Sequence, residues 1–237
     1  MPAFADGEAA TVSPWSGSVS FTSDYRFRGI SQTDRNPALQ GEIQYTGSQG
    51  VFAGAWASNV DFADGSASWE LDLFAGYTHA FNENTSGTVK VTYYVYPESN
   101  AVPNHDLDYF EASLGFEHDM GAAVLSLEAA YSPDYFGGTG AAISVQGGVE
   151  VPVVDSMYLF DKGLTASGHV GHQMIDDNVW SDIPDYTFYD IGFAATAGAF
   201  SLDVRYHGTD IDEVDCVSGT DWCEGGVVVT GSLSFGG

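Results

Sequence analysis

The sequence predicts an all-β protein, an antiparallel up-and-down transmembrane β-barrel of about 12 strands. The first observation is alternation with period two, as in 16–28, where Val19 and Phe21 fall on one face and Arg26 and Arg28 on the other. The second is the lack of an amphipathic helix that could cover a sheet. The third is width, because a barrel of more than about eight strands is too wide for apolar side chains to fill. The apolar faces are therefore expected to point into lipid and the charged faces to line an interior.

The elements follow one another at intervals of about 20 residues, which suits strands of about ten residues plus a connection. We expect strands over 16–28, 38–46, 51–60, 69–80, 87–96, 107–118, 122–132, 141–151, 164–174, 186–197, 199–208 and 227–235. Short connections at 47–50, 118–121 and 197–199 alternate with long ones at 29–37, 61–68, 97–106, 133–140, 175–185 and 209–226. Residues 152–163 should be a short connection and are not, so a small plug, an extra hairpin and an interfacial segment stay open.

The domain organisation is simple, with one barrel domain over residues 15–235. Residues 1–14 are expected to be a flexible N-terminal tail. Ala3-Phe4-Ala5 before Asp6 has the form of a signal-peptide cleavage remnant. The chain has 237 residues, and no linker divides it.

Aromatic residues at the expected strand ends support a membrane barrel. Interfacial aromatic rings form a girdle at each edge of the apolar band. One girdle is predicted from Tyr45, Phe52, Tyr77, Phe116, Phe200 and Phe235, and the other from Phe27, Phe62, Trp69, Tyr131, Tyr189 and Tyr206. A β-sandwich, the alternative fold, would instead gather its aromatic residues in the middle of its strands.

The charge of the chain limits its partners. Thirty-three acidic residues against six basic ones give a formal net charge of −27, which argues against nucleic acid and anionic lipid. Intrinsic disorder does not fit, because 44% apolar and 14% aromatic residues are too many for a chain that cannot collapse. The expected partners are the lipid bilayer and small polar solutes or ions, with the oligomeric state open.

Two cysteines, Cys216 and Cys223, lie seven positions apart in an acidic loop. A local disulfide is the natural interpretation, because cell-surface proteins are oxidised. Zinc is a poor alternative, since no further cysteine or histidine lies nearby. We expect no metal and no cofactor.

Two segments carry a family resemblance. Residues 23–40, SDYRFRGISQTDRNPALQ, and 56–62, WASNVDF, resemble the TorF family of bacterial porins. Shorter pieces agree, at 93–97 (YYVYP), 108–111 (DYFE) and 131–135 (YSPDY), so that the match covers nearly the whole chain. The resemblance implies a β-barrel in the outer membrane of a Gram-negative bacterium and little about its cargo. One departure is that Gly236-Gly237 follow Phe235, where such barrels usually end on an aromatic residue.

Strand parity predicts which polar residues face the lumen. They are Asp24, Arg26, Arg28, Gln40, Glu42, Asn59, Asp61, Glu70, Asp72, Lys90, Glu111, Glu128, Asp190, Asp203 and Arg205. Four of the six basic residues are among them. Either these bases face carboxylates across an aqueous pore and set its selectivity, or they form ion-pair networks that close the lumen. A backbone radius of about 12 Å makes any channel narrow.

Other candidate chemistry is weaker. His169 and His172 are three positions apart, so one strand presents them on opposite faces, and His169 is expected in the lumen with His172 near the outer rim. The acidic loops around Asp176-Asp177 and Asp212-Glu213 lack EF-hand spacing and are expected to be solvated. Ser167 and His169 share a face but point away from lipid, and no G-x-S-x-G segment is present, so we expect no enzyme.

The sequence therefore favours a narrow outer-membrane channel for passive diffusion of small polar solutes or ions. More inward acids than bases predict a preference for cations or zwitterions. The alternative is a non-conducting barrel whose acidic surface loops have a structural or adhesive role.

Overall fold

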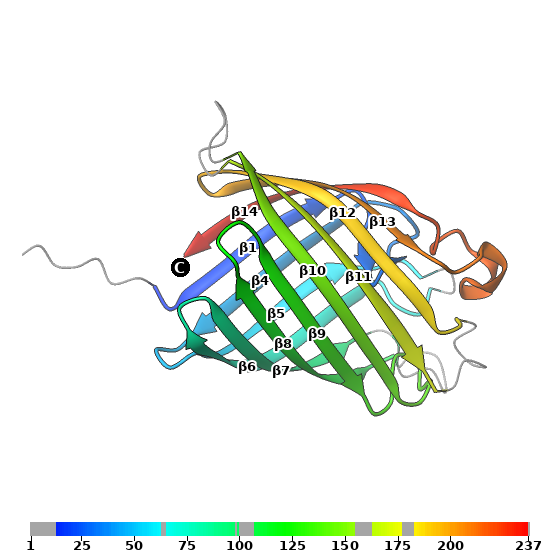
Figure 1. The fold of residues 1–237 in the computed structure, drawn as a ribbon. Helices are drawn as coiled ribbons and strands as arrows, with labels where there is room; N and C mark the ends of the chain where they lie inside the picture. Colours follow the sequence, from blue (N-terminus) through cyan, green and yellow to red (C-terminus); the bar gives the residue numbers. More distant parts are fainter. Residues whose placement is uncertain are drawn as a thin grey trace, which may run out of the picture.

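The computed structural model describes residues 13–62, 65–97, 99, 107–154, 163–176 and 183–236. Within them, twelve antiparallel strands close into one barrel, which confirms the predicted fold (Figure 1). The barrel strands are β1 (Trp15–Thr22), β4 (Ala38–Thr46), β5 (Val51–Asn59), β6 (Trp69–Asn82), β7 (Thr85–Val95), β8 (Tyr109–Asp119), β9 (Val124–Ser132), β10 (Ala142–Val154), β11 (Leu164–Ile175), β12 (Tyr186–Ala197), β13 (Phe200–Thr209) and β14 (Gly226–Gly236). No helix in this part of the chain is long and apolar enough to cross a membrane.

Neighbouring barrel strands are consecutive in sequence except at the seam. There β1 pairs with β14, from Ser16 opposite Gly236 to Thr22 opposite Thr230. The other edge of β1 pairs with β4. Between β1 and β4 the chain forms a separate two-stranded hairpin, β2 (Arg26–Phe27) and β3 (Ile30–Ser31).

The apolar faces of the strands lie on the outside of the barrel, as predicted. Phe21 and Leu233 are each 59% exposed, whereas Glu70 on the opposite face is 2% exposed. The sheet covers an interior rather than packing on a second layer. Apolar outside and polar inside is the arrangement of a barrel whose exterior meets lipid.

The two ends of the barrel differ in their connections. At the short-turn end lie tight turns such as Gly47–Gly50 and the pair Gly198-Ala199, together with the start of β1 and the end of β14. The other end, called the loop end, carries the long connections. At the short-turn end β10 extends through Val154, and residues 155–162 of the unexplained connection lie outside the described residues. The predicted tail over 1–14 also falls largely outside them.

The predicted girdles need three corrections. Nine of the twelve residues are exposed on the outside of the barrel, but Phe27 and Phe62 pack inside it. Phe52 also faces inward, where it lines a cavity. Alternation along β5 gives the wrong orientation, because the large apolar residues Phe52 and Trp56 point inward while the small residues Ala53 and Ala55 face outward.

The first strand is shorter than the predicted 16–28. It ends at Thr22, and residues 23–37, here called the lumen hairpin, turn back into the barrel (Figure 1). Extended hairpin residues keep the two-residue alternation, so periodicity alone does not reveal where the wall ends.

Candidate functional site: the barrel lumen

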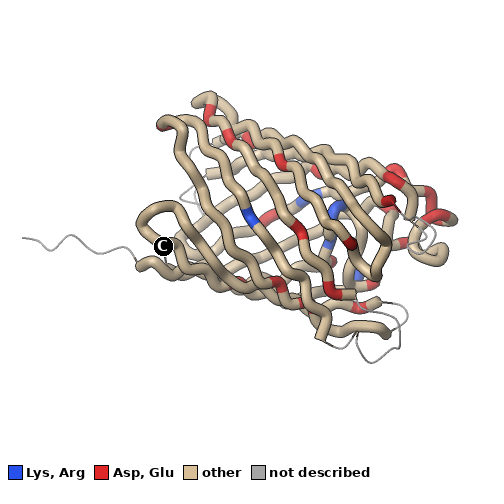
Figure 2. Tube along the Cα trace, turned by 90° about the horizontal axis from the view of Figure 1, so that it is seen from below, with Lys and Arg blue, Asp and Glu red and all other residues tan. Residues whose placement is uncertain are grey.

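Nine of the predicted lumen residues lie on the inward face of barrel strands. They are Glu42, Glu70, Asp72, Lys90, Glu111, Glu128, Asp190, Asp203 and Arg205. Residues directly opposite in an antiparallel pair share a face, and Gln40 lies on this face as well, opposite Ser58. Figure 2 shows acidic positions along the strands and gathered on the loops at one end.

Two predicted lumen residues are placed differently. Asn59 lies opposite Trp69, which is 51% exposed, so it faces outward. Its amide accepts a hydrogen bond from the Leu39 backbone N–H at 2.8 Å. Asp61 follows the end of β5 and is exposed. The inward prediction for Asn59 is therefore wrong, and the alanine-rich outer face of β5 explains why parity failed there.

Asp24, Arg26 and Arg28 belong to the lumen hairpin rather than to the barrel wall. The tight turn at Arg28-Gly29 has positive φ at both residues, 46° and 85°, as hairpin turns of this length require. A Cβ on Gly29 would lie 2.7 Å from Thr209 Cγ2. Glycine thus supplies both the left-handed backbone and the close approach of the turn to β13.

Asp24 and Arg26 organise the base of the hairpin. Asp24 pairs with Arg26 Nε at 2.5 Å and accepts a hydrogen bond from Ser31 Oγ at 2.7 Å. Arg26 Nη1 donates to the backbone carbonyls of Trp222 at 2.9 Å and Glu224 at 2.8 Å. The Arg26 side chain is 2% exposed, and its hydrogen bonds join the lumen hairpin to the segment that contains Trp222 and Glu224.

Arg28 crosses the lumen to the far wall. Its Nη2 donates to both carboxylate oxygens of Glu111 on β8, at 2.9 and 2.8 Å, and Nη1 donates to Gln173 Oε1 on β11 at 3.0 Å. Both partners in the Arg28–Glu111 pair are 9% exposed. Bidentate geometry of this kind is among the stronger charge-assisted contacts.

An aromatic cluster fills the lumen around the hairpin at the loop end. Tyr94 stacks on Tyr109 with ring centroids 4.2 Å apart, and Phe27 of the hairpin meets Tyr94 edge-on at 6.0 Å. Buried members of the cluster are Ile30, Val60, Phe62, Ala67, Tyr94, Tyr96, Leu107, Tyr109, Tyr186, Phe188, Ile211, Cys216, Trp222 and Cys223. In the sequence, adjacent aromatic residues such as Tyr93 and Tyr94 indicate that rings lie on both faces of the wall, because neighbours on a strand point to opposite faces.

The Tyr96 hydroxyl ties the aromatic cluster to the acidic wall. It donates to Glu70 Oε1 at 3.0 Å. Burial, followed by the nearby Glu70 charge, raises the pKa of Tyr96 well above its ordinary value, so that the phenol stays a donor. Glu70 Oε2 and Asp72 Oδ1 are buried without a hydrogen bond to the described part of the chain.

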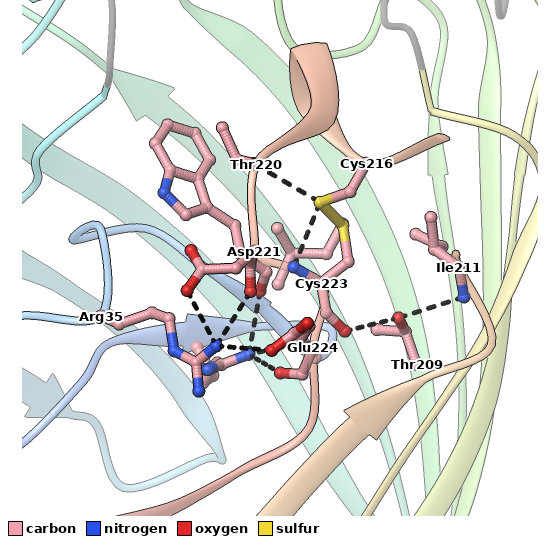
Figure 3. Close-up of a disulfide and its surroundings, with 12 residues drawn as sticks. Arg35, Thr209, Ile211, Cys216, Thr220, Asp221, Cys223 and Glu224 are labelled. Atoms are coloured by element: carbon pink, nitrogen blue, oxygen red, sulfur yellow. Dashed lines mark hydrogen bonds and ion pairs between the residues drawn. A yellow bond between two sulfur atoms is a disulfide. The ribbon is translucent and has the colours of Figure 1, made fainter. Parts of the chain in front are cut away.

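Residues 210–225, here called the disulfide loop, cover the hairpin. The predicted disulfide between Cys216 and Cys223 is present (Figure 3). The loop contains two short 3-10 turns, η2 (Glu213–Asp215) and η3 (Val217–Gly219). Trp222 Nε1 donates to Asp34 Oδ1 at 2.7 Å, and Arg35 pairs with Asp221 at 3.1 Å and Glu224 at 3.2 Å.

The half of the lumen near the short-turn end is hollow. A cavity of about 550 Å³ lies there, here called the lumen cavity. Its lining is mostly hydroxyl, amide and charged side chains: Gln44, Thr46, Thr78, Ser86, Thr88, Lys90, Ser113, Glu117, Ser126, Glu128, Gln146 and His169. Lys90 makes no ion pair with any residue that the structure describes.

A charged network lies beside the lumen cavity. Asp190 accepts from Arg205 and contacts His169 Nδ1 at 3.0 Å. Arg205 also donates to Asp203 at 3.1 Å and to Ser167 Oγ at 2.7 Å. Ser167 is therefore engaged by Arg205 rather than by His169, which is a poor arrangement for a nucleophilic serine.

The structure also bears on the two histidines and the acidic loops. His169 lines the lumen cavity, whereas His172 is exposed, opposite outward-facing Val145, as predicted. In the described residues, no three His, Cys, Asp or Glu side chains group as a metal site. Asp177 and Asp182 of one acidic loop lie outside the described residues.

Comparison with known proteins places the chain in a family. Residues 6–234 match the model of a bacterial protein family of unknown function, Gcw_chp. The chain belongs to this family. No curated protein matches the sequence, and the family description does not itself confirm the TorF resemblance.

Solved structures similar to this Gcw_chp protein include outer-membrane channels. The KdgM porin, in complex with disordered oligogalacturonate, aligns with a TM-score of 0.59 and 10% identity, over 93% of this chain and 99% of that one. The NanC porin gives 0.60 and 8%, over 92% and 98%. An outer membrane channel from Pseudomonas putida F1 gives 0.57 and 11%, over the full length of both. The fold of this Gcw_chp protein is thus that of outer-membrane porins, and with its apolar exterior the chain is an outer-membrane barrel.

Proposed function

We propose that this Gcw_chp protein is a narrow outer-membrane channel for passive diffusion of small polar solutes or ions, with a preference for cations or zwitterions. The observation that carries the proposal is the lumen cavity, a polar space of about 550 Å³ inside a barrel. The porin-like fold and the TorF resemblance support it. No cofactor is needed for diffusion through such a space.

The charge of the lumen wall supports the cation preference. Inward carboxylates on the barrel strands include Glu42, Glu117, Glu128 and Glu150, beside the buried Glu70 and the partly buried Asp72. Among the described residues, the basic residues on barrel strands are Lys90 on β7 and Arg205 on β13. Arg205 is already paired with two aspartates. Rings of carboxylates favour cations in pores.

The same balance disfavours acidic oligosaccharides. The KdgM porin was found with oligogalacturonate, a polyanion. Such a ligand would meet mainly carboxylates here, because the hairpin residues Arg26 and Arg28 are already bonded to Trp222 and Glu111. We therefore expect a solute class different from that of this structural neighbour.

Reversal potentials across a salt gradient in planar bilayers test the proposal. Single-channel steps with a reversal potential of the sign for cation flow are expected. Anion selectivity of the unmodified protein would overturn the cation preference. If the protein is folded and inserted in the bilayer but neither the wild type nor any variant conducts, the proposed channel function is wrong.

A second candidate is a non-conducting barrel whose acidic outer loops provide a structural or adhesive surface. The filled loop end favours this candidate, because the hairpin and aromatic cluster occupy the lumen there. The same bilayer recordings separate the two, since only the first predicts current.

A further inference from the structure

The lumen hairpin spans the barrel almost along a diameter. It leaves from β1, and β8 is the fifth strand from β1 in one direction and the seventh in the other. The Arg28–Glu111 ion pair therefore joins the hairpin turn to the side of the barrel opposite its origin. Any solute moving between the lumen cavity and the loop end has to pass this segment.

The hairpin is attached to the rest of the protein by few backbone contacts. Three backbone hydrogen bonds are described, Ser23 N to Val229 O, Ser31 N to Trp222 O and Asp61 N to Gln32 O. The internal ladder of the hairpin is two residue pairs long. Barrel strands are paired along both edges, so the hairpin can leave the lumen without breaking the wall.

Three residues of the hairpin are held in a left-handed backbone conformation although they are not glycine. They are Arg28, Asp34 and Arg35, with φ of 46°, 50° and 59°. Such conformations are unfavourable and persist only where surrounding contacts impose them. The contacts that do so here are the side-chain bonds of these same residues, to Glu111, Trp222 and the pair Asp221 and Glu224.

The disulfide loop provides the second attachment. Arg26 donates to two of its carbonyls, and Ser31 N donates to Trp222 O at 3.0 Å. The Cys216–Cys223 bond closes the segment that presents these carbonyls. Figure 3 shows the disulfide beside Asp221, Glu224 and Arg35.

We propose that residues 23–37 are the gate of the channel, held closed by the Arg28–Glu111 ion pair and by the disulfide loop. This inference rests on the proposed channel function. In the closed state the hairpin occupies the loop half of the lumen. In the open state the same segment moves toward the loop end, and its left-handed residues relax.

The experiment compares four forms of the full chain in planar bilayers: wild type, Arg28→Ala, Cys216→Ser with Cys223→Ser, and Glu83→Gln. Serine variants are preferred to a reductant, because both cysteines are buried. Glu83→Gln is the control, since it removes an exposed charge in the turn between β6 and β7, outside the lumen cavity. Hydrogen exchange of the hairpin amides is measured on each form.

A gate predicts that Arg28→Ala raises the time-averaged conductance about tenfold or more, as expected when one side of a buried ion pair is lost. The double serine variant should raise it by a smaller factor. Hairpin amides should exchange faster in both, with the barrel amides unchanged. The Glu83→Gln control should keep the wild-type conductance and hairpin exchange.

The outcomes separate the gate from the channel. Equal conductance in all four forms overturns the gate and leaves the channel intact. Silence of all four, with intact barrel protection from exchange, overturns the channel. If Arg28→Ala fails to fold, the double serine variant decides: faster hairpin exchange with unchanged conductance counts against the gate.

Discussion

The two halves of the lumen are built from the same strands and yet differ in kind. At the loop end, aromatic rings, the hairpin and the disulfide loop fill the space. At the short-turn end, hydroxyl, amide and charged groups surround a cavity of about 550 Å³. The side chains of a twelve-stranded wall do not fill the lumen by themselves. Additional segments fill the loop half, whereas the other half keeps a cavity.

The difference shows how charge is handled in each half. In the filled half, Arg26 and Arg28 donate to several carbonyl and carboxylate oxygens, as burial requires. In the hollow half, Lys90 has no described ion pair and Glu128 contacts Gln146 at 3.3 Å. We infer that charges in the filled half stabilise structure and those in the hollow half act on solutes.

The largest expected effect comes from comparing two arginines. Arg26→Met leaves Asp24 buried without its ion pair and should lower the free energy of unfolding by about 3–5 kcal/mol. Arg205→Met removes a side chain that is 15% exposed at the cavity, and Asp190 keeps His169, so a loss of about 1–2 kcal/mol is expected. Urea unfolding in lipid vesicles measures both. Equal losses would contradict the contrast between the halves.

Two aromatic residues provide the next comparison. Trp222→Phe removes the N–H that donates to Asp34 and part of a buried ring, with an expected loss of about 2 kcal/mol. Phe52→Leu, at the cavity, should cost about 1 kcal/mol or less. The same unfolding assay applies. A greater loss from Phe52→Leu would mean that the hollow half is packed more tightly than its cavity indicates.

The smallest effects concern selectivity and should have opposite signs. Glu128→Gln should lower the cation-to-anion permeability ratio about twofold, and Lys90→Met should raise it by a similar factor. Both shifts should shrink as salt rises, because the Debye length falls from about 10 Å at 0.1 M to about 3 Å at 1 M. Reversal potentials at two salt concentrations measure this. If both variants change the permeability ratio in the same direction, the prediction that both charges act on the permeating solute is wrong.

Much of the wall could be predicted from the sequence, because period-two alternation and connection length are local properties. The strand over 38–46 matches β4 at both ends, and the disulfide follows from spacing and context. The orientation of Phe21 and Glu70 follows from the same alternation.

The filling of the loop end could not be predicted in this way. Arg26 and Arg28 continue the alternation of β1, although the wall ends at Thr22, and only long-range contacts turn that segment inward. Phe27 and Phe62 were expected at the lipid edge, because an amphipathic ring suits either place. Asn59 was misplaced, since the outer face of β5 is made of alanines and carries little hydrophobic signal.

The segments that interlock inside the barrel are those that flank its seam. The hairpin follows β1 directly, the disulfide loop precedes β14, and these two strands are the last pair needed to close the cylinder. The contacts between Arg26 and the disulfide loop therefore join segments on the two sides of the β1–β14 junction. We expect these contacts to oppose the separation of two strands that are remote in sequence.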